Sequence, residues 1–402
     1  MATVSESGVP FDDFFGPQLP AHLYVHVPFC ASKCAYCDFA SVAGSDSQQV
    51  LAVFSGISAE VRRWGMSALP GVLETVYVGG GTPSLHADAV ARLLQRVAHD
   101  LPVRDGAEVT VEANPDSLDE QALEALLGGG ANRISVGVQA FDDRVLRLLG
   151  RLHDARAARR AATLVHEAGC ELSVDLICGV PGQSMASWVE TLEEALETGA
   201  KHLSIYPLAI EEGTPLAAAI SGGIVEEPDP DVAADMMLVG AERLARSGIV
   251  RYEVANYAAP GHEARHNTAY WTGRAYIGCG PGAHGMLDIQ TARAVGLYVP
   301  TAGEDVARVR YSANGDVDGW LTGTSGEIET LTRDQALRED VMLGMRLAEG
   351  VEARVVARAR LESVFADLAR DGLVESADGF WRTTTRGWLL GNEVFGRIWN
   401  RE

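Results

Sequence analysis

Three cysteines within eight residues are the part of this sequence best equipped for chemistry. Cys30, Cys34 and Cys37 have the spacing C-x3-C-x2-C in YVHVPFCASKCAYCDF, behind a short β-rich run. Three thiolates so close together can ligate three irons of an iron–sulfur cluster, which leaves the fourth iron open to bind and polarise a small molecule. Zinc is the alternative metal, but zinc ribbons usually supply two C-x2-C pairs, and no second pair occurs. Ordinary buried cysteines are a further alternative, which the clustering disfavours because the chain has only six.

The elements that position these cysteines are predicted to alternate between strands and helices. Six short, β-branched segments bounded by turn residues are predicted strands: residues 23–27, 75–80, 108–113, 133–138, 172–177 and 202–208. Amphipathic helices are predicted between them at 88–101, 117–127, 154–168 and 184–198, the second opened by a capping box of Ser117 and Glu120. Six βα units predict a parallel sheet with right-handed crossovers, short of a closed eight-stranded barrel.

Residues able to contact a ligand follow these predicted strands. Gly80, Gly81 and Thr82 come directly after the second strand, where glycine lets the backbone approach a ligand, although a tight turn gives the same letters. Glu112 closes the third strand, as a residue at the mouth of the sheet or as a helix cap. Asp175 lies within an apolar strand, where a carboxylate needs a partner or a ligand.

A second focus is the string HNTAYW, from His266 to Trp271. Histidine is a common heme ligand, and aromatic rings can stack on a porphyrin. From chemistry alone, however, a hydrogen-bonded core or surface histidine is the better interpretation. The glycine-dense segment 276–285, which holds His284, is not a dinucleotide fingerprint because no strand–helix unit brackets it.

These motifs together resemble a known family. C-x3-C-x2-C followed by an aromatic residue resembles the radical S-adenosylmethionine (SAM) superfamily, and the lead-in Y-x-H-x-P-F-C resembles its coproporphyrinogen III dehydrogenase group. Two features make the chain similar to the HemW family of heme chaperones within that group. One is the HNTAYW string, and the other is Phe39, which stands where porphyrin-oxidising members carry a further cysteine. The resemblance extends from about Ala21 to nearly the end of the chain.

The resemblance implies a fold, three cofactors and the residues that contact them. The fold is α/β, an open partial (βα)6 radical SAM barrel with reactive groups at the carboxyl ends of the strands, followed by a mainly helical, winged-helix-like domain. The cofactors are a [4Fe-4S] cluster on the three cysteines, SAM at its open iron, and heme. The implied SAM contacts are Tyr24, Tyr36, Gly80, Gly81, Thr82, Glu112, Gln139, Arg151, Asp175 and His284, of which Gln139, Arg151 and Asp175 match a second SAM site. The implied heme contacts are His266, Asn267, Tyr270 and Trp271, with Cys279 and His284 as alternative ligands.

The function that follows is that of a heme chaperone, with no catalytic residue assigned. Heme would pass to an acceptor hemoprotein, for which the family implies a membrane respiratory enzyme. The alternative is oxygen-independent coproporphyrinogen III dehydrogenase, a radical SAM enzyme of oxidative decarboxylation. Phe39 and HNTAYW disfavour that alternative.

The composition limits which partners and which cellular compartment we expect for this chain. A formal net charge of −22 over 402 residues argues against nucleic acid and anionic lipid as partners. No apolar run reaches the ~18 residues of a membrane span, and the first residues lack the pattern of a signal peptide. Six cysteines, three of them clustered, predict reduced thiols in the cytoplasm, with Cys170, Cys178 and Cys279 as packing residues.

Four parts are predicted along the chain. They are an N-terminal extension (1–20), the partial barrel (21–228), a linker helix with a Gly- and aromatic-rich region carrying HNTAYW (229–325), and the winged-helix-like domain (326–402). In the last part we expect helices at 333–347 and 352–370, a hairpin at 373–384 and a final helix. Because this part shows no basic stripe, we interpret it as a lid or a homodimer contact rather than a DNA-binding domain.

Overall fold

The computed structural model describes residues 18–67, 69–298 and 305–400, so most of the predicted N-terminal extension lies outside the described residues. A curved sheet of twelve strands forms the centre, in the order β14-β13-β12-β11-β1-β4-β5-β6-β7-β8-β10-β9. Six consecutive parallel strands are the six predicted ones: β1 (His22–Val27), β4 (Leu73–Gly80), β5 (Val103–Ala113), β6 (Arg133–Gln139), β7 (Glu171–Cys178) and β8 (His202–Pro207). The predicted open α/β barrel is confirmed.

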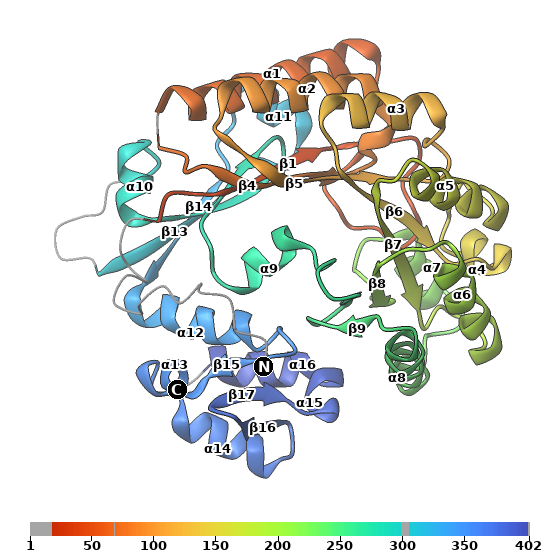
Figure 1. Ribbon diagram of the computed structural model, residues 1–402, viewed down its shortest axis with the longest axis vertical. Coiled ribbons are helices and arrows are strands. Elements are labelled where there is room, and N and C mark those ends of the chain that lie inside the picture. Colours follow the sequence, from red (N-terminus) through yellow and green to blue (C-terminus); the bar gives the residue numbers. More distant parts are fainter. Residues whose placement is uncertain (1–17, 68, 299–304, 401–402) are drawn as a thin grey trace.

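The connecting helices cover the outer, convex face of this sheet (Figure 1). They are α1 (Ser47–Ser67), α2 (Ala87–Asp100) after the short turn η2 (Pro83–His86), α3 (Glu120–Gly129), α5 (Ala155–Glu167) and α6 (Met185–Glu197). The short helix α4 (Asp143–Leu148) packs instead with Tyr36 and Leu208 near the cysteine loop. Asp154 and Ser184 cap the N-termini of α5 and α6 with their side chains. The predicted capping box at Ser117 is wrong: α3 begins three residues later, where Asp119 accepts from the backbone N–H of Ala122.

Each barrel strand has an apolar outer face and a polar inner face. The outward residues pack beneath the helices in one core, for example Ile134 and Val136 of β6 and Leu203 and Ile205 of β8. The residues between them line the inside of the barrel: Thr110 and Glu112; Arg133, Ser135, Gly137 and Gln139; Ser173, Asp175 and Ile177; His202, Ser204 and Tyr206. In these strands, residues that pack in the core therefore alternate with residues that line the cavity.

The Gly- and aromatic-rich region extends both edges of the sheet. On the side of β1 it adds β11 (Tyr276–Cys279), β12 (His284–Asp288) and β13 (Val306–Ser312). Beyond β13 lies β14 (Glu327–Thr332), which comes from the start of the predicted C-terminal part. On the side of β8 it adds β10 (Asn256–Ala258) and β9 (Val250–Arg251). Its helices are α9 (Arg265–Trp271), α10 (Ile289–Ala294) and α11 (Val317–Leu321), and α7 (Pro215–Ser221) and α8 (Pro230–Arg246) precede it. Figure 1 shows α9 on the concave side of the sheet.

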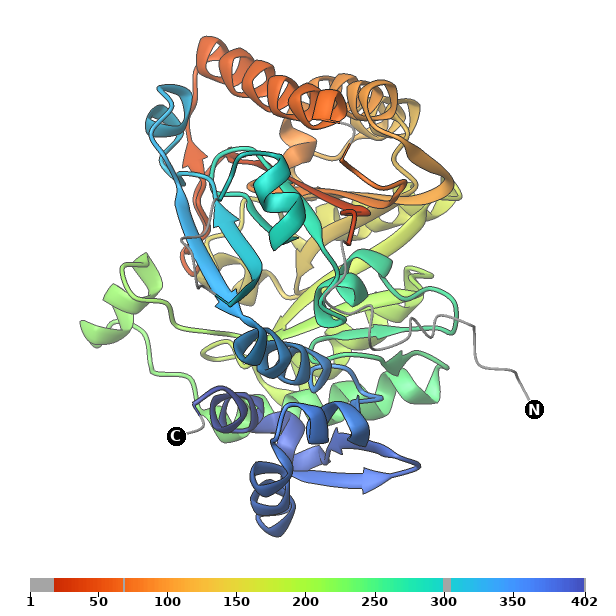
Figure 2. The ribbon, with the colours of Figure 1, turned by 90° about the vertical axis from the view of Figure 1, so that its left-hand side faces the viewer.

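The C-terminal part has its own apolar core, centred on buried residues such as Val341, Phe365 and Val394. It contains α12 (Arg333–Gly344), β15 (Val351–Glu352), α13 (Ala353–Arg358), α14 (Glu362–Arg370), β16 (Val374–Ala377), β17 (Phe380–Thr383), α15 (Thr385–Leu389) and α16 (Gly391–Trp399). The helix expected at 352–370 is broken, because Arg360 adopts a positive φ of 55° between α13 and α14. Figure 2 shows the β13–β14 hairpin running down to α12, where the Nη2 of Arg308 donates to Asp340 at 2.9 Å.

Candidate functional site: a cysteine loop over a polar cavity

The cysteine loop is anchored at both ends and in the middle. Strand β2 (Phe29–Cys30) pairs in parallel with β3 (Val42–Ala43), which closes the loop. In the middle, the backbone N–H of Ala35 donates to the carbonyl of Leu149 at 3.0 Å, and the N–H of Leu216 donates to the carbonyl of Ala35 at 2.8 Å. The loop is therefore fixed between the end of α4 and the start of α7.

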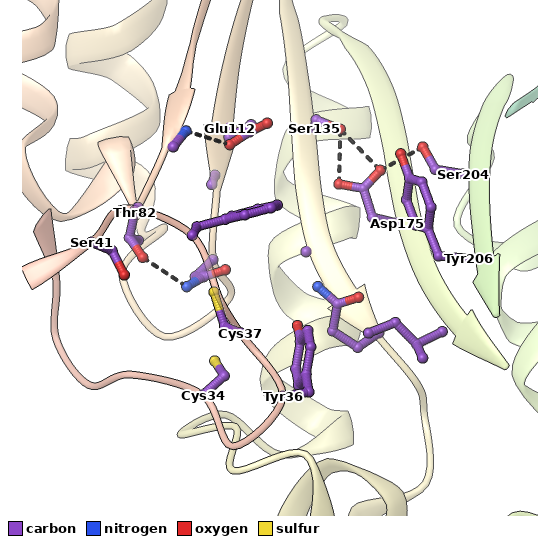
Figure 3. A pocket seen from close by; sticks show the side chains of 18 of the residues that line it. Cys34, Tyr36, Cys37, Ser41, Thr82, Glu112, Ser135, Asp175, Ser204 and Tyr206 are labelled. Atoms are coloured by element: carbon purple, nitrogen blue, oxygen red, sulfur yellow. Dashed lines mark hydrogen bonds between the residues drawn. The ribbon is translucent and has the colours of Figure 1, made fainter. Parts of the chain in front are cut away.

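All three thiols line one cavity, of about 410 Å³, at the carboxyl ends of the barrel strands. Figure 3 shows Cys34 and Cys37 beside Tyr36 at one end of this cavity, with Glu112 and Asp175 further in. Burial raises the pKa of the Cys37 thiol. Among the described residues, no three His, Cys, Asp or Glu side chains converge as a site for a single metal ion. A cubane cluster needs a different arrangement, since each thiolate binds a separate iron.

A chain of hydrogen bonds joins two of the thiols from the barrel side. Thr82 Oγ1 lies 3.7 Å from Cys30 Sγ and accepts from Asn114 Nδ2 at 2.9 Å. Asn114 Oδ1 in turn accepts from Arg151 Nη2 at 2.6 Å, and Arg151 Nη1 donates to Cys34 Sγ at 3.4 Å. Hydroxyl and guanidinium donors aimed at sulfur are the donors that a thiolate-bound cluster needs. The residues present therefore fit a [4Fe-4S] cluster.

Glu112 lies at the end of β5, directly against the glycine-rich end of β4. Its carboxylate accepts from Tyr77 Oη at 2.7 Å and from the backbone N–H of Gly80 at 3.0 Å. Burial, together with the nearby charge of Asp175, raises the pKa of Glu112 to about 7, although these two hydrogen bonds lower it. A carboxylate that is half neutral near pH 7 is poised to ionise when a cationic group arrives. An amino group is such a partner.

Gly79 and Gly80 have no Cβ, and this allows Glu112 and His26 to approach the backbone of β4 closely. A Cβ on Gly79 would lie 2.8 Å from the Glu112 carboxylate. Gly80 has a φ of +111°, and its Cβ would lie 2.6 Å from the ring of His26. Because His26 Nε2 is hydrogen-bonded to the carbonyl of Ala40 at 2.8 Å, a side chain at Gly80 would push His26 against the cysteine loop.

The predicted second group of SAM contacts also lines the cavity. Asp175 accepts from Ser204 Oγ at 2.7 Å and from Ser135 Oγ at 3.0 and 3.1 Å, and burial raises its pKa. Gln139, at the end of β6, has a φ of 65°, and its amide lies over Gly137. Gln139, Arg151 and Asp175 thus face one space from three neighbouring elements.

Two predicted SAM residues are placed differently. Tyr24 does not line the cavity; its hydroxyl is hydrogen-bonded to His26 Nδ1 at 3.0 Å, and its ring stacks on that of Tyr77. His284 is exposed at the start of β12 and does not line the cavity either. Tyr36, Gly80, Gly81, Thr82, Glu112, Gln139, Arg151 and Asp175 are the predicted SAM residues that the cavity brings together.

The HNTAYW string forms α9, and most of it faces inward. His266 is 1% exposed, and both ring nitrogens are occupied: Nδ1 is bonded to Thr75 Oγ1 at 2.6 Å and Nε2 to Tyr270 Oη at 2.9 Å. Burial lowers its pKa to about 3, so the ring is neutral. Trp271 packs against the guanidinium of Arg346. Of the four predicted heme contacts, Asn267 lines the cavity.

The other sequence-predicted residues are placed as follows. Phe39 lines the cavity from the cysteine loop and is 61% exposed. Cys178 and Cys279 are buried on β7 and β11, and Cys170 packs at the edge of the core. Burial raises the pKa of Cys170 to about 11 and that of Cys178 to about 12, as is usual for packing thiols.

Sequence reasoning missed several residues that shape the site, namely His26, Tyr77, Asn114, Ser135 and Ser204. For four of them the signal was present in the alternation H-x-Y-x-H of β1, T-x-Y of β4, R-x-S of β6 and H-x-S-x-Y of β8, whereas Asn114 directly follows β5. Polar residues at every second position of a parallel strand mark an inner face that water or a ligand fills.

Fold, cysteine loop and glycine-rich strand end together define a protein of the radical SAM superfamily. The model of that superfamily matches residues 24–195, and the model of the HemN C-terminal domain matches residues 331–390. Among solved structures, coproporphyrinogen III oxidase (HemN) from Escherichia coli superposes with a TM-score of 0.75 at 22% identity, over 96% of this chain and 91% of that one. This likeness establishes the fold.

Two related proteins narrow the assignment from the radical SAM superfamily to one family within it. A Mycobacterium tuberculosis protein named Heme chaperone HemW is 36% identical over 94% of each chain. A Bacillus subtilis protein of the same name is 32% identical over 93% of this chain and 97% of its own. The chain belongs to the HemW family.

Within the described parts of the chain, no helix is long and apolar enough to cross a lipid bilayer.

Proposed function

We propose that this chain is a heme chaperone that binds a [4Fe-4S] cluster and SAM, and passes heme to an acceptor hemoprotein. The observation that carries the proposal is the placement of Phe39. It lies on the cysteine loop and faces the cavity, where the resemblance gives porphyrin-oxidising members a further thiol. The names of the relatives in Mycobacterium tuberculosis and Bacillus subtilis support the same function.

Cys30, Cys34 and Cys37 would hold the cluster, and when bound it would supply an open iron for SAM. The protein's own contribution is to keep three thiolates close together in a partly buried place. The anchored loop fixes their backbone, and Thr82 and Arg151 donate hydrogen bonds to two of them. These donors offset the negative charge that three thiolates bring into the cavity.

SAM would lie between the cysteine loop and the end of β4. Glu112 is placed to accept from its amino group, and Gly80 and Gly81 line the cavity beside it. Gln139, Arg151 and Asp175 line the same cavity, which supports a second SAM site on these residues.

Heme would bind at the exposed rim of the barrel rather than at α9 as it lies in this structure. Axial ligation by His266 would break two buried hydrogen bonds. Cys279 is 1% exposed, whereas His284 is exposed on the neighbouring strand end. Of the three ligands considered from the sequence, His284 is thus the accessible one, and the exposed ring of Phe39 offers an aromatic face for a porphyrin.

The test is a pair of parallel measurements on anaerobically reconstituted protein. We expect heme titration to give a saturable Soret band, and incubation with coproporphyrinogen III, SAM and a reductant to give no protoporphyrinogen IX. Protein with all three clustered cysteines changed to alanine controls for cluster-dependent chemistry. Porphyrinogen oxidation with consumption of SAM would replace the chaperone by the dehydrogenase, and absence of heme binding would also overturn the proposal.

A further inference from the structure

The deep end of the cavity carries two buried donors that nothing in the described structure satisfies. Thr110 of β5 and Arg133 of β6 are register partners, and both side chains line the cavity. Thr110 is 2% exposed and Arg133 is 6% exposed. Thr110 Oγ1 and Arg133 Nη1 are nevertheless without a hydrogen-bond partner among the described residues. Buried polar groups of this kind cost free energy unless a ligand or water bonds to them.

The rest of the Arg133 side chain is fixed. Nη2 donates to the carbonyl of His262 at 2.9 Å, and Nε lies 3.5 Å from Glu108 Oε2. Glu108 also accepts from the backbone N–H groups of Arg265 and His266, both at 3.0 Å. The guanidinium is thus held by the start of α9 while its remaining nitrogen, Nη1, is left to a ligand in the cavity.

The carboxylates beside Arg133 are already bonded to other groups. Glu171, its register partner on β7, is hydrogen-bonded to His262 Nδ1 at 2.8 Å. His202 is hydrogen-bonded through Nδ1 to Ser173 at 2.7 Å and through Nε2 to Tyr252 at 2.9 Å. Burial and the charge of Arg133 lower the pKa of His202 to about 3, so it is neutral. Asp175, four residues beyond Glu171 on β7, accepts from two serines.

We propose that this end of the cavity is a subsite for a carboxylate group of a bound ligand. Arg133 Nη1 and Thr110 Oγ1 donate to the carboxylate oxygens, and Asn267 is a further polar residue that lines the cavity. A guanidinium paired with a hydroxyl favours a carboxylate because both donors gain a charged acceptor in a place of low dielectric. Ordered water could bond to the same two atoms. A site that only holds water would respond equally to a carboxylate and to chloride.

The test uses sodium propionate as the probe, with sodium chloride at equal ionic strength as the reference. Propionate is expected to raise the thermal unfolding midpoint of the wild-type chain above the chloride value. Thr110→Val removes the unsatisfied hydroxyl at nearly constant shape. It should therefore leave stability without ligand equal or higher and weaken propionate binding about tenfold, the usual effect of losing a hydrogen bond to a charged group.

Two control variants accompany Thr110→Val. Thr110→Ser keeps the hydroxyl and should retain propionate binding. Thr291→Val removes a buried hydroxyl that donates to Asp288 at 2.6 Å outside the cavity. It should lower stability and leave propionate binding unchanged. Equal stabilisation by propionate and chloride, or unchanged propionate affinity in Thr110→Val, would overturn the subsite.

The rim position proposed for heme favours a separate small molecule as the source of the carboxylate. Heme dimethyl ester tests whether a heme propionate reaches this end of the cavity instead. If the carboxylate is a heme propionate, the ester binds the wild-type chain more weakly than heme does, and the difference disappears in Thr110→Val. If heme and its ester bind equally while sodium propionate still stabilises, the subsite takes a separate carboxylate. The propionate measurement does not rest on the proposed function, so a failure to bind heme at all would count against the chaperone and leave the subsite standing.

Discussion

Arg151 and Cys34 are in direct contact, with the Nη1 of the arginine 3.4 Å from the thiol sulfur. The same guanidinium donates through Nη2 to Asn114 and to the carbonyl of Gly137. Sequence resemblance assigned Arg151 to SAM alone. The contact with Cys34 leads us to expect a second role, because a buried cation beside a thiolate lowers the energy of added negative charge there.

The first prediction concerns this contact. Arg151→Met removes the charge and the donor, and is expected to shift the reduction potential of the reconstituted cluster to a more negative value, since hydrogen bonds to the sulfurs and local charge set that potential. A redox titration followed by electron paramagnetic resonance measures it. Arg144→Met, at an exposed arginine that pairs with Asp142, is the matched control and should leave the potential unchanged. A wild-type potential in Arg151→Met would refute the electrostatic role.

The second prediction concerns cluster binding itself. Cys30→Ala, Cys34→Ala or Cys37→Ala should each abolish the iron–sulfur absorption after anaerobic reconstitution, because the other thiols lie elsewhere in the fold. Cys170→Ala, at the edge of the core, should keep it. Iron and sulfide analysis of the purified proteins gives the measurement, and four irons per chain in the triple variant would show that the cluster is held by other residues.

The third prediction uses the titration of Glu112. Its pKa is raised from 4.5 to about 7, so between these values the folded chain holds a proton that the unfolded chain has released. Stability without SAM should therefore be greatest below the lower value and fall as pH rises through about 7, by roughly 3 kcal/mol in total from this group. Glu112→Gln cannot ionise and should lose this part of the pH dependence. Urea unfolding of both proteins from pH 5 to 8 checks it, and identical slopes would contradict the raised pKa.

SAM affinity should show the opposite dependence on pH. An ionised Glu112 pairs with an amino group, so SAM should bind more tightly as pH rises through about 7. In Glu112→Gln the affinity should be about tenfold or more lower at pH 8 and nearly independent of pH, because a charge-assisted hydrogen bond is lost. Isothermal titration at several pH values measures both effects. A pH-dependent affinity that persists in Glu112→Gln would assign the titration to another group, such as Asp175.

How far the sequence predicts this molecule depends on how local each feature is. The six barrel strands and the helices between them follow from short periodic patterns, and the cysteine loop from its spacing. Asn114 was not predicted to link Thr82 with Arg151, because that link joins the ends of three different elements. Likewise, Gly80 was expected to affect SAM alone. Its contact with His26 shows that Gly80→Val would also strain the cysteine loop. The short strands β11 and β12 carry too few residues for a clear alternation, so their place in the sheet was missed.

The last prediction separates the two histidines considered for heme. His266→Ala removes a fully buried ring and two hydrogen bonds, and should lower stability by about 2–5 kcal/mol. At a temperature where the variant stays folded, its Soret maximum should match that of the wild-type protein. His284→Ala changes an exposed residue, so we expect stability to stay within about 0.5 kcal/mol of the wild type. Its Soret maximum should shift and its Kd for heme should rise by about one order of magnitude, about 1.4 kcal/mol.

Thr75→Val adds a control, because it removes one partner of His266 without touching the ring. If His266 became a ligand when α9 moves, loosening it through Thr75 would tighten heme binding and His266→Ala would shift the Soret band. That pair of results would move the heme from the rim to the inside of the barrel.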